Sequence, residues 1–178
     1  MAMHSVTFYL PGDKGRLLSS LQEVLVKYMK VLPNLHMTIA NPFYLKVPVS
    51  VIEQKLEDIA RRTKQFPLKC KDIKRFESSV GVSYNIAIED EKPVIDLHYA
   101  IYSSISTIID DYNKDKFNLI NFTPHLTMGY VSKELVSDVE KAIKGYSVQF
   151  EVLFDCYSLC VAGDNGMWTI LWKFSLSG

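Results

Sequence analysis

The feature that most constrains the fold of this chain is a short pattern that occurs twice, half a chain length apart. Leu35–Phe43 reads LHMTIANPF and Pro124–Tyr130 reads PHLTMGY, so each places a histidine two residues before a threonine in an apolar, strand-like run. A helix is predicted before each of these strands and another after it. We therefore predict two αβα halves related by an approximate two-fold axis, which would bring the two motif strands together.

Strand alternation divides each motif into two faces. His36 and Thr38 share one face with an alanine, and His125 and Thr127 share the corresponding face of the second strand with a glycine. The apolar residues between them occupy the opposite face, which is expected to pack in the core. The small third residue leaves space beside each His and Thr, so an anion could lie there against two imidazoles and two hydroxyls.

These side chains suit the cleavage of a phosphodiester. Neutral imidazole can accept a proton from attacking water and imidazolium can donate one to the leaving oxygen, because His titrates near neutrality. The Thr hydroxyls can donate to the nonbridging oxygens, and β-branching keeps them aimed. We predict His36 and His125 as the acid and base pair, with the order of roles open, and Thr38 and Thr127 as phosphate-orienting donors. This chemistry requires no metal, and no obvious carboxylate cluster is present to hold one.

The periodicity elsewhere predicts an α+β protein, mainly antiparallel, with helices on the outer faces of its sheets. Helices are expected at about 13–28, 50–64, 98–112 and 132–144; strands are expected at 4–10, 35–45, 68–76, 80–89, 93–97, 124–130, 149–161 and 167–176. The last strand is predicted to bury one face, made of Trp168, Ile170, Trp172, Phe174 and Leu176. No linker divides the chain, so residues 1–178 are predicted to form a single bilobal domain.

Composition and charge exclude several classes of protein. Lys plus Arg and Asp plus Glu both number 20, which argues against holding duplex nucleic acid by phosphate neutralisation. No apolar run approaches the roughly 20 residues that cross a bilayer, and the first residues do not resemble a signal peptide. We expect a cytoplasmic protein with no membrane contact and no evident obligate protein partner. Cys70, Cys156 and Cys160 are predicted to be reduced structural thiols, with a disulfide or a catalytic thiol as the alternative.

The paired motifs, HMTI at 36–39 and HLTM at 125–128, resemble those of the 2H phosphoesterase superfamily, which includes LigT-like proteins often called 2'-5' RNA ligases and cyclic nucleotide phosphodiesterases. FTPHLT at 122–127 is similar to the second motif of LigT-like members. The resemblance covers the whole chain. It implies a bilobal fold with two mainly antiparallel sheets around a central cleft, and metal-independent, cofactor-free action on 2',3'-cyclic phosphates or related RNA-end phosphodiesters.

One departure from the family concerns the substrate. Many LigT-like members carry a basic residue just after the second motif, where this chain has Gly129 and Tyr130. A small nucleotide, or another cyclic or diester phosphate, therefore fits the sequence as well as an RNA end. Phe43, Tyr44 and Tyr130 are candidates for substrate binding, and Phe43 or Tyr44 could stack on a base. For those two residues, packing against their own sheet is the alternative.

The other polar residues are not included in the predicted catalytic set. His98, at a predicted strand-to-helix junction, is expected to be structural or on the surface, and His4 is expected to be exposed near the terminus. Lys14 and Arg16 could bind a phosphate tail or simply form a solvated helix start.

Two further functions stay open. One is a binding module that recognises a phosphorylated nucleotide or an RNA end without turning it over, although permanently charged Arg would serve pure binding better than His. The other is a metal-binding protein that uses the two motif histidines, for which further ligands are missing.

Overall fold

The computed structural model describes residues 2–12, 18–28, 30–78, 81–112, 122–164 and 167–178. The strands are β1 (Met3–Tyr9), β2 (Lys30–Leu45), β3 (Phe66–Ser78), β4 (Gly81–Ile88), β5 (Ile109–Asp111), β6 (His125–Val131), β7 (Gln149–Phe154), β8 (Cys156–Ala162) and β9 (Trp168–Ser175). The helices are α2 (Ser19–Leu25), α3 (Val49–Arg62), α4 (Lys92–Ile105) and α5 (Val136–Ile143), and a short 3₁₀ turn (Lys133–Leu135) precedes α5.

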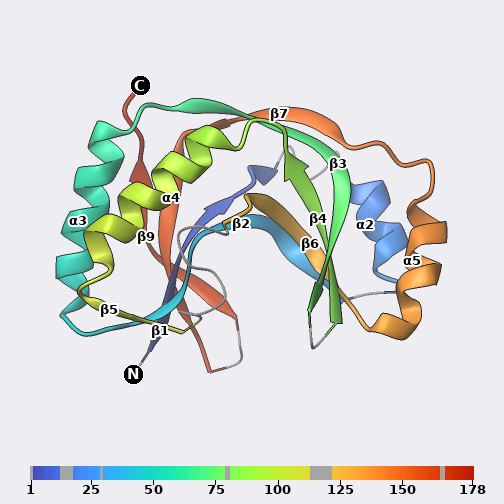
Figure 1. Cartoon of the computed structure of the whole chain (residues 1–178), viewed down its shortest axis with the longest axis horizontal. Coiled ribbons are helices and arrows are strands. Elements are labelled where there is room, and N and C mark those ends of the chain that lie inside the picture. The colour runs from blue at the N-terminus through green and yellow to red at the C-terminus, as the bar shows by residue number, and fades with distance from the viewer. Residues whose placement is uncertain (1, 13–17, 29, 79–80, 113–121, 165–166) are drawn as a thin grey trace.

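One curved sheet runs through the molecule. Within the described residues its strand order is β7-β3-β4-β6-β2-β1-β8-β9, with β5 paired to β2 beside this path. The strand pairs are antiparallel. Figure 1 shows α3 and α4 at one end of the curved sheet and α2 and α5 at the other. The predicted α+β class with mainly antiparallel strands and outer helices is confirmed.

The two motif strands are neighbours at the centre of this sheet. β2 and β6 pair directly, with His36 opposite Thr127. β1, β8 and β9 extend from β2 on one side, and β4, β3 and β7 extend from β6 on the other, so each side of the sheet combines strands from both halves of the sequence. The predicted division into two successive αβα halves is therefore wrong, although the motif strands do meet. Because β2 and β6 bond to each other, the two sides form one continuous sheet and both motifs lie in one surface.

The apolar positions of the motifs face the core, as strand alternation predicts. Leu35, Met37 and Ile39 of β2 are buried, and so are Leu126 and Met128 of β6. The helices bury one stripe each in the same way: α3 through Ile52, Leu56, Ile59 and Ala60, and α4 through Val94, Leu97, Ile101 and Ile105, among others. Burying these faces holds the opposite face of the motif strands in place for the polar residues.

The last strand differs from the prediction. Phe174 and Leu176 are buried, and Trp172 packs partly against the core. Trp168 and Ile170, predicted to share that buried face, keep 36% and 49% of their surface exposed. β9 is the edge strand of the sheet and pairs with β8 alone in the described path, so the core covers only its C-terminal half. Alternation identifies a face of a strand, but it does not show how far along the strand that face is covered.

Two predicted strands are wrong. The segment predicted as one strand at 149–161 forms β7 and β8, which pair with β3 and β1 and lie far apart in the strand order. The segment 93–97, predicted as a strand, belongs to α4, with Pro93 in the first turn. Proline is well tolerated there because the first helical N–H groups have no partner within the helix.

Helix starts also differ in detail. Ser50 and Glu53 were expected to form a capping box, but α3 begins at Val49, with Pro48 at the N-cap and no side-chain cap bond. The predicted N-cap Asp13 lies outside the described residues, as do Lys14 and Arg16. Within the range predicted for the first helix, the structure describes α2.

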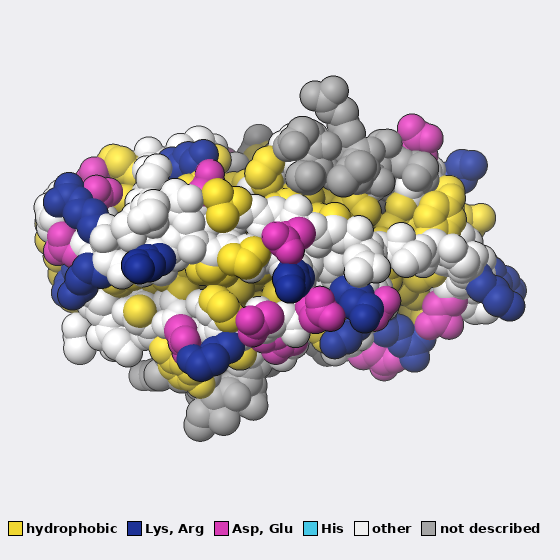
Figure 2. All heavy atoms as spheres, turned by 90° about the horizontal axis from the view of Figure 1, so that it is seen from above, with side chains coloured by type: hydrophobic (Ala, Val, Ile, Leu, Met, Phe, Trp, Pro, Cys, Tyr) yellow, Lys and Arg dark blue, Asp and Glu magenta, His cyan; other side chains and the backbone are white. Residues whose placement is uncertain are grey.

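The surface and the thiols agree with the expectations from composition. On the face in Figure 2, Lys and Arg side chains are interspersed with Asp and Glu. No helix among the described residues is both long and apolar enough to pass through a membrane. Cys70, Cys156 and Cys160 are free, and burial raises the pKa of the Cys70 thiol to about 12. A thiol with that pKa stays protonated at neutral pH, which suits a structural role.

Candidate active site

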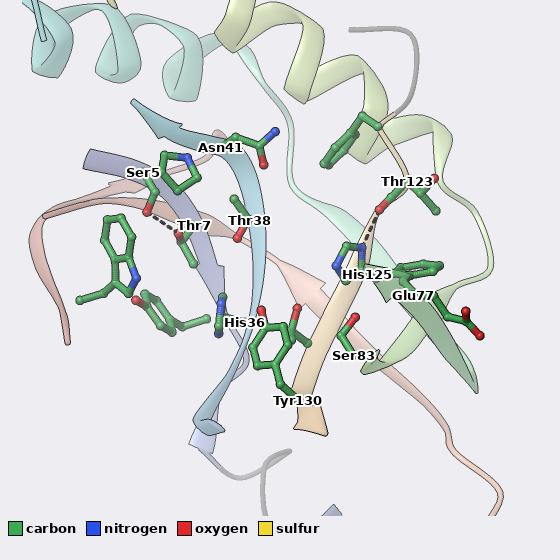
Figure 3. A pocket seen from close by; sticks show the side chains of 16 residues that line it. Ser5, Thr7, His36, Thr38, Asn41, Glu77, Ser83, Thr123, His125 and Tyr130 are labelled. Carbon is green, nitrogen blue, oxygen red and sulfur yellow. Dashed lines mark hydrogen bonds between the residues drawn. The ribbon is translucent and has the colours of Figure 1, made fainter. Parts of the chain in front are cut away.

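A pocket of about 530 Å³ lies over the centre of the sheet, where the two motif strands meet. Its lining includes all four predicted catalytic residues: His36, Thr38, His125 and Thr127. In Figure 3, His36 and Thr38 project from one strand and His125 from its neighbour, all into the same space. The structure therefore brings together the two motifs that lie half a chain length apart.

His125 is held in one orientation by the backbone just before its strand. Its Nδ1 lies 2.7 Å from the carbonyl oxygen of Thr123, and because a carbonyl can only accept, Nδ1 carries the proton and donates. Neutral His125 then keeps its lone pair on Nε2, on the opposite side of the ring. Phe76 presents an edge-to-face contact to the same ring, with centroids 4.9 Å apart. Tautomer and orientation are thus both set before a ligand binds.

The pKa of His125 lies below its usual value. Burial is the main cause, because it disfavours the charged ring. The bond to the Thr123 carbonyl raises the pKa, and the positive charge of His36 lowers it further. His125 is therefore neutral at pH 7, and the two imidazoles are close enough to influence each other's charge.

His36 is supported from the strand on its other side. Tyr9 of β1 is its Cα partner in the sheet, and the two rings are 5.9 Å apart at a tilt of 44°. The Tyr9 hydroxyl in turn lies 3.6 Å from the sulfur of Cys160 on β8. A chain of side chains across three strands thus packs against the His36 ring.

Sequence analysis missed further hydroxyls that line the pocket, among them those of Ser5, Thr7 and Ser83. Ser5 and Thr7 of β1 are buried and their hydroxyls lie 3.2 Å apart; Thr7 pairs with Thr38 in the sheet. Ser83 of β4 accepts a hydrogen bond from the side-chain amide of Asn85, at 2.9 Å, so its own proton is available elsewhere. Strand alternation on β1 and β4 signals these positions, but only once their pairing with β2 and β6 is known.

The pocket contains little fixed charge. Among its described lining residues there is no Lys or Arg, and Glu77 is the one carboxylate. No group of three or more His, Cys, Asp or Glu that could hold a metal ion occurs in the described part of the chain. An anion here would meet neutral donors and, when protonated, an imidazolium.

The three aromatic residues predicted to bind substrate lie in different places. Tyr130 lines the pocket and keeps 52% of its surface exposed. Phe43 is fully buried and stacks on His4, and Tyr44 makes an edge contact with Tyr112. The structure does not bring Phe43 or Tyr44 to the pocket. Both pack within the fold, which was the alternative to substrate binding for these two residues.

The two remaining histidines are buried. His4 was predicted to be exposed, which is wrong: β1 lies inside the sheet between β2 and β8, so the side chain is covered. His98 has a structural position, as predicted, since its Nδ1 lies 2.6 Å from the carbonyl oxygen of Ile39 and its ring stacks on Phe122 at 3.9 Å. Phe122 lines the pocket, so His98 supports one of its walls.

Acid is expected to destabilise the fold through these buried histidines. Burial is the main cause that lowers the pKa of His98 from its usual 6.5, although the Ile39 carbonyl and Asp111 oppose it. As the pH falls through 6.5 the unfolded chain takes up a proton that folded His98 refuses, so stability drops, by at most about 1.4 kcal/mol per pH unit for each such group. Above that pH both states are neutral and the effect is absent.

Urea unfolding between pH 7.5 and 5.5 measures this dependence. His98→Asn, which keeps a donor for Ile39 but no titrating ring, is expected to have a smaller slope of unfolding free energy against pH than the wild type. Some slope should persist, because burial also lowers the pKa of His4 and His125. An unchanged slope in His98→Asn would show that His98 does not contribute.

Comparison with known proteins agrees with the fold. A family model described as the 2'-5' RNA ligase superfamily matches residues 11–166. No curated protein sequence matches the chain. Three solved structures align along the whole chain: TT0787 of Thermus thermophilus (TM-score 0.72, 18% identity, 100% of this chain and 99% of that one), E. coli LigT complexed with 3'-AMP (0.68, 17%, 99% of each) and Kluyveromyces marxianus Usb1 with uridine monophosphate (0.56, 9%, 98% of each). The predicted LigT-like fold is confirmed.

Proposed function

The chain belongs to the 2'-5' RNA ligase superfamily of 2H phosphoesterases, and from that premise we propose that it is a metal-independent phosphodiesterase that hydrolyses 2',3'-cyclic phosphates or related RNA-end phosphodiesters. The observation that carries the proposal is the meeting of both His and Thr pairs in one pocket, with His36 opposite Thr127 on adjacent strands. A fold that only buried its histidines would not aim two of them, with two hydroxyls, at the same space.

We assign the base to His125 and the acid to His36. Neutral His125, with its lone pair on Nε2, takes a proton from water as the water oxygen bonds to phosphorus. The bond from phosphorus to the ribose 2' or 3' oxygen breaks, and that oxygen takes a proton from the His36 imidazolium. The product is a nucleoside monophosphate, and the two histidines return to their starting states by proton exchange with solvent. Thr38 and Thr127 donate to the nonbridging oxygens throughout.

The charge of the pocket supports a diester as substrate. A phosphodiester carries one negative charge, whereas a monoester carries about −1.5 to −2 at neutral pH. With no Lys or Arg among its described lining residues, the pocket suits the singly charged diester and favours release of the product. Two of the similar structures, LigT and Usb1, are complexed with nucleotides, which supports a nucleotide here. Three free cysteines support a reducing, cytoplasmic location.

The alternative is a binding module for phosphorylated nucleotides or RNA ends. The uncharged residues Gly129 and Tyr130, which follow the second motif in place of a basic residue, favour it. The lowered pKa of His125 counts against it, because a neutral imidazole adds less to anion binding than a charged one does.

Product analysis tests the proposal. EDTA-treated protein is incubated with nucleoside 2',3'-cyclic phosphates and with short RNAs that end in a cyclic phosphate, beside the His36→Ala variant. We expect the wild type alone to form a monophosphate, and the position of that phosphate identifies the leaving oxygen. Ligand binding without turnover would instead support the binding module, and neither binding nor turnover would show that the substrate class is wrong.

A further inference from the structure

One part of the pocket has no role in the reaction described above. It lies over β1 and β9, on the far side of His36 from β6, and includes Ser5, Thr7 and Trp168. Trp168 is a large aromatic residue that keeps 36% of its surface exposed on an edge strand. Tryptophan is highly buried on average, so this indole is more exposed than most.

The pocket extends to both sides of the histidine pair. From His36 and Thr38 on β2 it continues across their sheet partners Tyr9 and Thr7 on β1. Beyond β1 it reaches Trp168, whose strand β9 pairs with β8.

In the opposite direction the pocket crosses β6 and is lined there by Phe76, Ser83 and Tyr130. There is thus an aromatic wall on each side of the site where the phosphate would react, and one nucleoside would occupy only one of them.

On the side of the pocket that includes Trp168, the floor is polar. Ser5 and Thr7 are both 4% exposed, line the pocket and lie within hydrogen-bond distance of each other at 3.2 Å. Figure 3 shows both hydroxyls on β1, on the opposite side of Thr38 from His125. Hydroxyls act as donors and as acceptors, so this pair can bond to the hydroxyls of a sugar as well as to each other.

We propose that Trp168, Ser5 and Thr7 form a second nucleoside site, in which a nucleobase stacks on the indole and its ribose bonds to the two hydroxyls. Aromatic stacking accepts any base because every base has a π face. The inference rests on the proposed function and narrows its substrate class to nucleic-acid ends of at least two nucleosides, in preference to a mononucleoside cyclic phosphate.

Tryptophan fluorescence tests this site without requiring turnover. The chain has 2 Trp residues, so Trp172→Phe leaves Trp168 as the sole reporter, and adding His36→Ala prevents consumption of the ligand. We expect an adenosine dinucleotide with a terminal 2',3'-cyclic phosphate to quench Trp168, and adenosine 2',3'-cyclic phosphate to quench it far less. In the matched Trp168→Phe protein, where Trp172 reports, neither ligand should change the emission. Equal quenching of Trp168 by both ligands, or none by either, would overturn the inference.

Kinetics separate this inference from the proposed function. Trp168→Ala is expected to lower kcat/KM for the dinucleotide about tenfold or more, and to change the value for the mononucleoside cyclic phosphate less than about twofold. Ile170→Ala is the control, since Ile170 is exposed on the same strand but does not line the pocket. If the wild type hydrolyses both ligands and Trp168→Ala leaves their ratio unchanged, the second site is wrong and the function stands. If the wild type hydrolyses neither, the proposed function fails and fluorescence alone decides the site.

Discussion

Replacing His125 with alanine is expected to lower kcat for cyclic phosphate hydrolysis by about 10²- to 10⁴-fold, the usual contribution of one acid or base group. His36→Ala should cause a loss of similar size, because the two proton transfers belong to the same step. The melting temperature should change little. His125 is only partly buried, and its bond to the Thr123 carbonyl contributes about 1 kcal/mol.

Steady-state kinetics and thermal melts on the same samples measure both effects. Turnover at the wild-type level in either variant would show that the histidines are not the acid and base. NMR titration of His36→Gln provides an independent check on their contact. Because the charge of His36 lowers the pKa of His125, its removal should raise that pKa; an unchanged value would mean that the two rings do not interact as described.

Removing the motif hydroxyls is expected to have the next largest effect. Thr127→Val keeps the shape and the β-branch but has no donor for the phosphoryl oxygen, so kcat should fall by about 10²- to 10³-fold, as for the loss of one oxyanion donor. Thr38→Val is expected to lower kcat by a similar factor. Thr127 is buried on the wall of the pocket, and an apolar residue of equal shape there should leave the free energy of unfolding nearly unchanged.

A matched substitution distinguishes this role from a general effect of losing a threonine. Thr169→Val makes the same chemical change at an exposed position of β9 that does not line the pocket, and should keep wild-type kinetics. Thr127→Ser, which restores the hydroxyl without the stiffening methyl group, should recover part of the lost rate. If Thr127→Val keeps kcat within about threefold of the wild type, the hydroxyl does not stabilise the transition state.

The candidate site could be predicted in part from local patterns. Alternation along a strand depends only on neighbours in the sequence, so it placed His36 and Thr38 on the face opposite Met37 before any fold was known. It could not find Ser5, Thr7 or Ser83, because each joins the site through pairing with a distant strand. The same limit explains why Phe43 and Tyr44, close to the first motif in sequence, lie outside the pocket.

The sequence by itself determined which residues carry the chemistry and which face of each motif strand they occupy, because side-chain type and strand period are local properties. Only the tertiary structure decided that β2 and β6 are adjacent, that Nδ1 of His125 donates to Thr123, and that burial lowers the pKa of that imidazole. It also decided that the core covers only the C-terminal part of β9, so that Trp168 at the start of this strand stays outside the core and lines the pocket. Strand order, desolvation and the extent of the core depend on contacts between distant segments, and those contacts exist only once the chain has folded.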